Sequence, residues 1–191
     1  MQLILASQSP RRKELLGLFH IPFTVQVADI DEAMDPSKSP QEEVSRVSRL
    51  KALAVAGNSE DVIIAADTIV VLEGNVLGKP ADRRDAIRML TALSGRDHQV
   101  MTGVTVVRGS RILTHTEVTD IHFRSLSQAE ILRYVDTGEP MDKAGSYGIQ
   151  GGAALFVEKM HGDYYNVMGL PVCRLWQMLH AVAPEIMEDP Q

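Results

Sequence analysis

Short apolar runs mark the expected strands of this chain. They predict strands at residues 3–6, 62–72, 76–77, 99–107, 112–123, 155–160 and 164–167. The run at 62–72 is the longest, and nine of its eleven residues are apolar, which is typical of a strand buried on both faces. The turn signal Glu73-Gly74-Asn75 follows it, so residues 76–77 are expected to return as the second strand of a hairpin.

Capping residues mark the expected helix starts. Ser9 followed by Pro10 predicts a helix, because serine accepts a hydrogen bond from the first turn and proline fits the first helical position. Its apolar face is expected to bury Leu15, Leu16, Leu18 and Phe19. Segments 39–42 and 127–130 each place serine three residues before glutamate, which is a capping box, and further helices are expected at 82–93 and from residue 171. Helices that separate short hairpins indicate an α/β fold with a mixed sheet and flanking helices.

Composition narrows the class of protein. The chain has 191 residues, 45% hydrophobic and 23% charged, so we expect one globular domain over residues 1–191, in two lobes, and exclude disorder and coiled coil. A net charge of −6 argues against a nucleic acid polymer or an acidic membrane surface as partner.

The expected compartment follows from the cysteine count and the apolar runs. The single cysteine, Cys173, cannot close an intrachain disulfide. The first residues lack the basic stretch of a signal peptide, and the longest nearly apolar run is eleven residues, against the roughly 20 that span a bilayer. We therefore expect a cytoplasmic protein.

The first candidate binding site is the start of the helix that Ser9 caps. Arg11, Arg12 and Lys13 lie in its first turn, where the helix dipole disfavours cations, so an anion is expected to bind there. The hydroxyls of Ser7 and Ser9 would complete a phosphate site. The alternative is a solvated basic helix face.

Two charged residues are expected at buried positions. On the helix that begins at Pro40, Lys51 falls on the apolar face with Val44 and Val47, so its ammonium faces a site or extends to the rim of the core. Asp67, next to Thr68, interrupts the apolar strand at its middle. A buried carboxylate is costly unless a cation, a metal or a proton neutralises it, and the alternative is a structural aspartate at a strand kink.

Two glycine-containing segments resemble phosphate motifs only superficially. The segment that ends at Lys79 has Pro80 where a P-loop needs serine or threonine, so a P-loop is rejected, although Lys79 remains a candidate phosphate contact. Residues 145–151 precede a strand instead of a helix, which excludes a dinucleotide fingerprint. Gln150 in this loop offers a donor and an acceptor to a ligand base.

Taken together, these segments resemble the Maf family of nucleoside triphosphate pyrophosphatases, from residue 3 to about residue 179. The motifs that carry the resemblance are Ser7-Gln8-Ser9-Pro10-Arg11-Arg12, Glu32, Lys51, Ala66-Asp67-Thr68, Gly78-Lys79-Pro80, Ser94-Gly95-Arg96, Asp142-Lys143-Ala144-Gly145-Ser146-Tyr147-Gly148-Ile149-Gln150-Gly151 and Gly169-Leu170-Pro171. The resemblance implies an elongated two-lobed α/β fold with a central cleft, similar to inosine triphosphate pyrophosphatases. It also implies a homodimer.

The resemblance further implies cleavage of the α–β anhydride of a nucleoside triphosphate, with release of pyrophosphate. Asp67 then looks like the proton acceptor, with Glu32, Lys51 and Lys79 around the triphosphate. Glu32 and Asp67 are expected to bind a divalent cation, Mg²⁺ or Mn²⁺.

The remaining implied contacts concern substrate choice. Lys143 would add a cation for the phosphates. Arg11, Thr68 and Gln150 stand where the branch of the family acting on dTTP and UTP has its specificity residues. The alternative function is a non-catalytic nucleotide-binding regulator.

Overall fold

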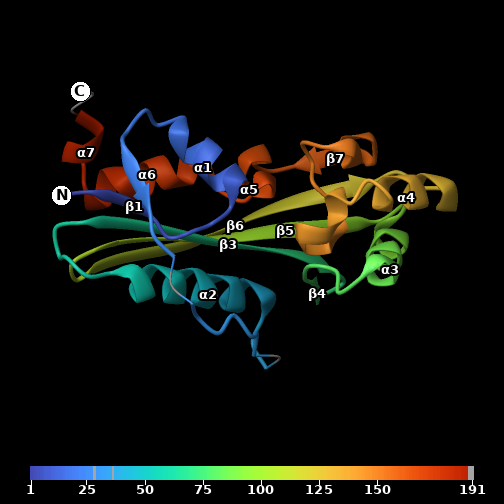
Figure 1. The fold of residues 1–191 in the computed structure, drawn as a ribbon, viewed down its shortest axis with the longest axis horizontal. Coiled ribbons are helices and arrows are strands. Elements are labelled where there is room, and N and C mark those ends of the chain that lie inside the picture. The colour runs from blue at the N-terminus through green and yellow to red at the C-terminus, as the bar shows by residue number, and fades with distance from the viewer. Residues whose placement is uncertain (28, 36, 189–191) are drawn as a thin grey trace. The chain divides into compact units, whose positions relative to one another are not determined.

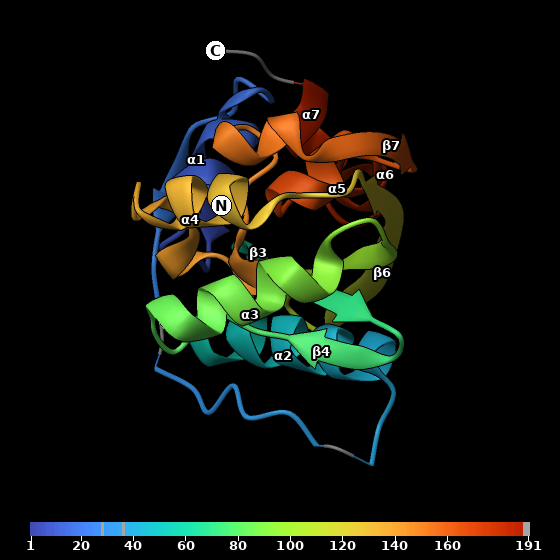
Figure 2. The same ribbon diagram turned by 90° about the vertical axis from the view of Figure 1, so that its right-hand side faces the viewer.

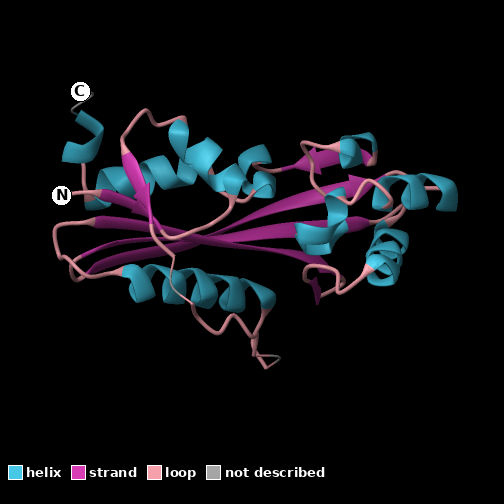
Figure 3. Ribbon diagram, in the orientation of Figure 1, coloured by secondary structure: helices cyan, strands magenta, loops and turns pink. Residues whose placement is uncertain are grey.

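The computed structural model describes residues 1–27, 29–35 and 37–188 of the chain (Figures 1 and 3). The strands are β1 (Leu3–Leu5), β2 (Phe23–Val25), β3 (Val62–Leu72), β4 (Asn75–Leu77), β5 (Asp97–Arg108), β6 (Arg111–Phe123) and β7 (Val157–His161). The helices are α1 (Pro10–Gly17), α2 (Pro40–Val55), α3 (Arg83–Leu93), α4 (Gln128–Val135), α5 (Tyr164–Met168), α6 (Val172–Val182) and α7 (Glu185–Glu188). Short 3-10 helices are η1 (Glu139–Asp142), η2 (Ala144–Ser146) and η3 (Gly152–Leu155).

The chain forms two compact units. The first unit contains Met1–Asp67, Thr102–Glu117 and the chain from Gly169 onward, and the second contains Thr68–Met101 and Val118–Met168. Three strands, β3, β5 and β6, contribute residues to both units, and the boundary in β3 falls between Asp67 and Thr68.

The first unit is a mixed sheet with helices on both faces. Its strand order is β2-β1-β3-β5-β6, and β1 pairs in parallel with β2 and with β3. Within this unit, α2 lies along one face of the strands, and α1 and α6 lie along the other (Figures 1 and 2). The helix α2 approaches β5 closely at Gly103. A Cβ built on this glycine would lie 2.3 Å from the carbonyl oxygen of Val44. Only glycine fits at that crossing.

The second unit packs helices and 3-10 turns against its own residues of β3, β5 and β6. Its strand order is β4-β3-β5-β6-β7, with β6 antiparallel to β7. The rings of Phe123, Tyr134 and Phe156 pack edge-on in its core, with centroid separations of 5.9 and 5.2 Å around Phe156. This core anchors the glycine-rich loop, whose Gly145 N–H donates to the carbonyl of Gly78 at 3.0 Å.

Most of the predicted elements are confirmed, and the expected mixed α/β fold is correct. The strand predicted at 62–72 is found with the same bounds, and residues 75–77 return as the predicted hairpin strand. Ser9 caps α1, and Ser39 and Ser127 form the predicted capping boxes of α2 and α4.

Two local predictions are wrong. Residues 164–167 were expected to form a strand but form α5, because Asp163 accepts a hydrogen bond from the amide of Tyr165 at 2.8 Å and so starts a helical turn. Leu18 was expected to be buried, but α1 ends at Gly17 and the Leu18 side chain lies beyond the helical face, 54% exposed.

Candidate active site

Asp67 lies at the centre of β3, where the first segment of the first unit ends. Ala66 before it is buried, Thr68 after it is partly exposed, and the Asp67 side chain is only 13% exposed. Its Oδ1 accepts a hydrogen bond from the ammonium of Lys51 at 2.7 Å. The buried carboxylate is therefore neutralised by a cation, one of the three solutions that the sequence left open.

Lys51 reaches this position from α2. The apolar residues Val44 and Val47 on the same helix are buried, which turns the Lys51 side chain toward the sheet and leaves it 15% exposed. Its ammonium also lies 3.0 Å from Oε2 of Glu32, whose side chain is 57% exposed. One ammonium thus joins two carboxylates from segments 35 residues apart in the sequence, and all three predicted residues come together.

The turn between β1 and α1 is the second predicted part of the site. The Oγ of Ser9 caps α1 by accepting from the Arg12 N–H, and Ser7 Oγ accepts from the Ser9 N–H at 3.3 Å. No acidic residue lies in the first turn of α1, so the cations there keep their positive field.

Arg12 has a structural role in this turn. Its Nε donates to the carbonyl of Gly169 at 2.8 Å, and its Nη1 donates to Ser7 Oγ at 3.1 Å. Burial is the main cause that lowers the pKa of Arg12, while the charge of Asp67 acts in the opposite direction. Arg12 therefore ties the turn to the segment before α6 and adds positive charge near Asp67.

The other predicted residues, Thr68, Lys79, Lys143 and Gln150, belong to the second unit. Lys143 does not extend freely: its ammonium donates to the carbonyl of Glu139 at 2.6 Å and to Asp142 at 2.7 Å. Gln150 lies in the glycine-rich loop between η2 and η3.

The residue that braces this loop, Glu139, was not predicted from the sequence. The carboxylate of Glu139 accepts from the hydroxyl of Tyr134 at 2.9 Å and from the N–H of Gly152 at 3.1 Å. A Cβ on Gly151 would lie 2.0 Å from Glu139 Oε1, so the carboxylate keeps this position only beside a glycine. The glycines of the loop were visible in the sequence, but nothing there indicated which side chain occupied the space.

An ion pair between Glu43 and Arg46 on α2 contacts the loop of Glu32, and it was not predicted either. The signal was present, because opposite charges three residues apart on a helix face each other. That spacing is usual on solvated surfaces, and nothing in the sequence showed that Glu43 is buried.

The fold and the family follow from comparison with known proteins. The structure is similar to that of a HAM1 protein from Coxiella burnetii, with a TM-score of 0.51 and 15% sequence identity, over 95% of this chain and 99% of that chain. At this identity the similarity concerns the fold alone, which is the mixed α/β fold of the HAM1 protein. The family described as Maf-like protein matches residues 2–182, and the chain belongs to this family, as the motifs in the sequence indicated.

Curated relatives match over nearly their whole length. One from Symbiobacterium thermophilum is 55% identical over 93% of this chain and 92% of its own. Those from Bacillus pumilus and Alkaliphilus metalliredigens are 50% and 48% identical, over 93% and 94% of this chain and 95% of their own. All three are named dTTP/UTP pyrophosphatase.

Among the helices that the structure describes, we find none with the length and apolar character that crossing a bilayer requires.

Proposed function

We propose that this protein hydrolyses dTTP and UTP, including modified uridine triphosphates, to the nucleoside monophosphate and pyrophosphate. The observation that carries the proposal is the Lys51 ammonium held between the carboxylates of Asp67 and Glu32, at 2.7 and 3.0 Å. The substrate class rests on the names of relatives that are 48–55% identical to this chain.

In this reaction a water molecule attacks the α-phosphorus and the α–β anhydride bond breaks. Asp67 takes the proton of the attacking water, and pyrophosphate leaves with its electron pair. Lys51 orients the Asp67 carboxylate through its hydrogen bond and offsets part of the negative charge of the triphosphate.

The carboxylates also fit a divalent cation. Carboxylate oxygens are the ligands that Mg²⁺ and Mn²⁺ prefer, and Mg²⁺ usually takes only one or two of them together with water and substrate phosphates. In the described part of the chain, no group of three or more His, Cys, Asp or Glu side chains could hold a metal. Asp67 and Glu32 would hold the cation, and a bound cation would neutralise charge that develops on the phosphates.

The N-terminus of α1 supplies the proposed phosphate site. Ser7 and Ser9 offer hydroxyls, Arg11 and Arg12 offer charge, and the dipole of the helix favours an anion at its N-terminus. From the second unit, Lys79 would contact phosphate, and Lys143 would do so by exchanging its bond to Asp142. Arg11, Thr68 and Gln150 would select the pyrimidine base.

Pyrophosphate release tests the proposal. The purified protein is incubated with a panel of nucleoside triphosphates, with Mg²⁺, with Mn²⁺ or with EDTA, and pyrophosphate is converted to phosphate by an added pyrophosphatase and measured. We expect many turnovers per protein with dTTP and UTP, far fewer with purine nucleotides, and none with EDTA. Binding of dTTP without pyrophosphate release would contradict the proposal and favour a nucleotide-binding regulator.

We further propose that the protein is a cytoplasmic homodimer. Light scattering on the purified protein measures its oligomeric state, and cell fractionation measures its compartment. A single species at the monomer mass of 21.0 kDa would contradict the dimer.

A further inference from the structure

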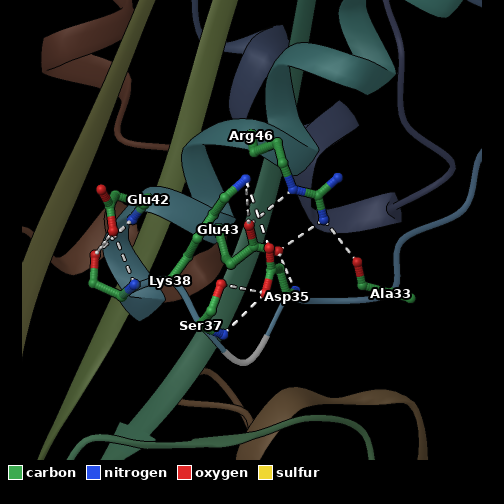
Figure 4. Close-up of polar contacts among 8 residues, drawn as sticks. Ala33, Asp35, Ser37, Lys38, Glu42, Glu43 and Arg46 are labelled. Carbon is green, nitrogen blue, oxygen red and sulfur yellow. Dashed lines mark hydrogen bonds and ion pairs between the residues drawn. The ribbon is translucent and has the colours of Figure 1, made fainter.

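An ion pair on α2, between the buried Glu43 and the partly exposed Arg46, contacts the loop that carries Glu32 (Figure 4). The side chain of Glu43 is 2% exposed, and both of its oxygens accept hydrogen bonds from Arg46, Oε1 from Nε at 2.9 Å and Oε2 from Nη2 at 2.8 Å. These bonds are the main cause that holds the pKa of Glu43 below its usual range. The pair is therefore ionised at neutral pH.

Each partner of the pair also binds the loop backbone. Glu43 Oε2 accepts from the N–H of Asp35 at 2.8 Å, and Arg46 Nη2 donates to the carbonyl of Ala33 at 2.7 Å. One donor and one acceptor of the loop, two residues apart, are thus fixed to α2. Residues 29–35 form no helix or strand, so regular backbone pairing does not hold this segment (Figure 3).

The fixed segment adjoins Glu32 directly. Ala33 follows Glu32 in the chain, and the Glu32 carboxylate meets Lys51 at 3.0 Å. Lys51 lies eight residues beyond Glu43 on the same helix, about 12 Å along its axis. A single helix therefore supplies both the ion pair that holds the loop and the ammonium that the loop's carboxylate reaches.

The contact between Glu32 and Lys51 needs such support. The Glu32 side chain is 57% exposed, and an exposed ion pair contributes little by itself, since ordering two long side chains offsets the attraction. A carboxylate on an irregular loop binds a cation well only if the loop already holds it in place.

We propose that Glu43 and Arg46 are positioning residues, which act through the backbone of residues 33–35 to place the Glu32 carboxylate beside Lys51. They thereby set the affinity of the site for the divalent cation that accompanies the triphosphate. This inference rests on the proposed function, because Glu32 is a metal ligand only within it.

Hydrogen exchange tests the first half of the inference without metal or nucleotide. The variants are Glu43→Gln, which keeps the size of the side chain, and Arg46→Lys, which keeps its charge. Both lose the paired hydrogen bonds. The control is Glu42→Gln, the same change one residue earlier, where the carboxylate accepts from Ser39 at 2.9 and 2.7 Å. We expect amide exchange in residues 29–35 to be at least tenfold faster in the two variants than in the control. Equal exchange in all three proteins would overturn the inference.

Metal titration tests the second half. The Mn²⁺ concentration that gives half-maximal pyrophosphate release from dTTP is expected to rise at least fivefold in Glu43→Gln and in Arg46→Lys, with kcat at saturating Mn²⁺ reduced no more than threefold. Glu42→Gln is expected to match the unsubstituted protein. A lowered Tm with an unchanged Mn²⁺ requirement would overturn the inference, because it would show a role in stability alone.

The two tests separate this inference from the proposed function. If the unsubstituted protein releases no pyrophosphate, the proposed function fails, and the exchange rates still decide whether the ion pair holds the loop. If it does release pyrophosphate and neither variant differs from the control, only the positioning role fails. Arg46→Lys serves as the second variant should Glu43→Gln not fold.

Discussion

The ammonium of Lys51 lies 2.7 Å from Oδ1 of Asp67, so a cation carried by α2 neutralises a carboxylate at the centre of β3. Both side chains are largely shielded from water, at 15% and 13% exposure. Removal of one partner would therefore leave a shielded charge uncompensated, so the pair is tested for its effect on stability as well as for the chemistry proposed for it.

Replacement of the proposed proton acceptor tests the chemistry. Asp67→Asn keeps the size of the side chain but cannot take a proton from water, so we expect kcat for dTTP to fall by about 10²–10⁴-fold or more while the protein stays folded. The measurement is pyrophosphate release, with circular dichroism to verify the fold. Asp61→Asn is the control, because that carboxylate binds the N–H of Gln2 at 2.9 Å just before β3, and its activity should stay within about twofold. Undiminished turnover in Asp67→Asn would show that another group is the base.

Unfolding measurements test the stability of the ion pair. Lys51→Met leaves the Asp67 carboxylate without this cation, so the free energy of unfolding is expected to fall by about 1–3 kcal/mol. In an Asp67→Asn background the same substitution should cost clearly less, because no charge is left uncompensated there. Urea unfolding of the four proteins gives the coupling energy. Additive effects would mean that the two residues do not stabilise each other.

Buried His98 predicts how stability depends on pH. The side chain is 3% exposed, and burial lowers its pKa from 6.5 to about 4, so the folded state binds this proton less readily than the unfolded chain. The contribution of neutral His98 to the free energy of unfolding is complete above pH 6.5 and is lost as the pH falls from 6.5 toward 4. The free energy of unfolding therefore falls by about 2 kcal/mol between pH 7 and pH 5 from this residue. Urea unfolding at these two pH values measures the loss. In His98→Gln the loss should be smaller by that amount, and equal losses in both proteins would exclude His98 as its source.

A single added methyl group tests the glycine-rich loop. In Gly151→Ala the Cβ would lie 2.0 Å from Glu139 Oε1, so the carboxylate must move and release Tyr134 and Gly152. We expect a loss of stability of about 1–2 kcal/mol and a raised KM for dTTP, because Gln150 is displaced with the loop. Thermal unfolding and initial rates measure both effects. Gly57→Ala is the control, since nothing lies within 4 Å of a Cβ there, and an equal effect in the two variants would contradict a role for Glu139.

Local signals predicted most of the elements. The apolar run at 62–72 and the capping serines at positions 9, 39 and 127 gave strands and helix starts that the structure confirms, because these features act over a few residues. The short helix α5 was predicted as a strand, since its tyrosines and valine favour strands. The buried Asn166 favours the helix instead, because its side-chain amide donates to the carbonyl of Val100 at 3.0 Å. Local propensity does not include such a tertiary contact.

The site could be predicted in part for the same reason. The position of Asp67 in an apolar strand and of Lys51 on an apolar helix face indicated that both side chains point inward, and the structure joins them. The partners of Glu43 could not be predicted, because they include the backbone N–H of Asp35 in a loop without a regular pattern. Residue types are visible in a sequence, whereas the placement of an irregular loop follows from its tertiary contacts.

The contacts of Arg46 and Lys51 fix the number of residues between them on α2. Each residue of a helix adds about 100° of rotation and 1.5 Å of rise, so one residue inserted between Arg46 and Lys51 would turn the ammonium by about 100°. Seven inserted residues would nearly restore the direction of the side chain but would shift the ammonium by about 10 Å along the helix axis. No insertion or deletion in this stretch preserves both the loop anchor and the ion pair, so sequences that keep this site can diverge here only by substitution.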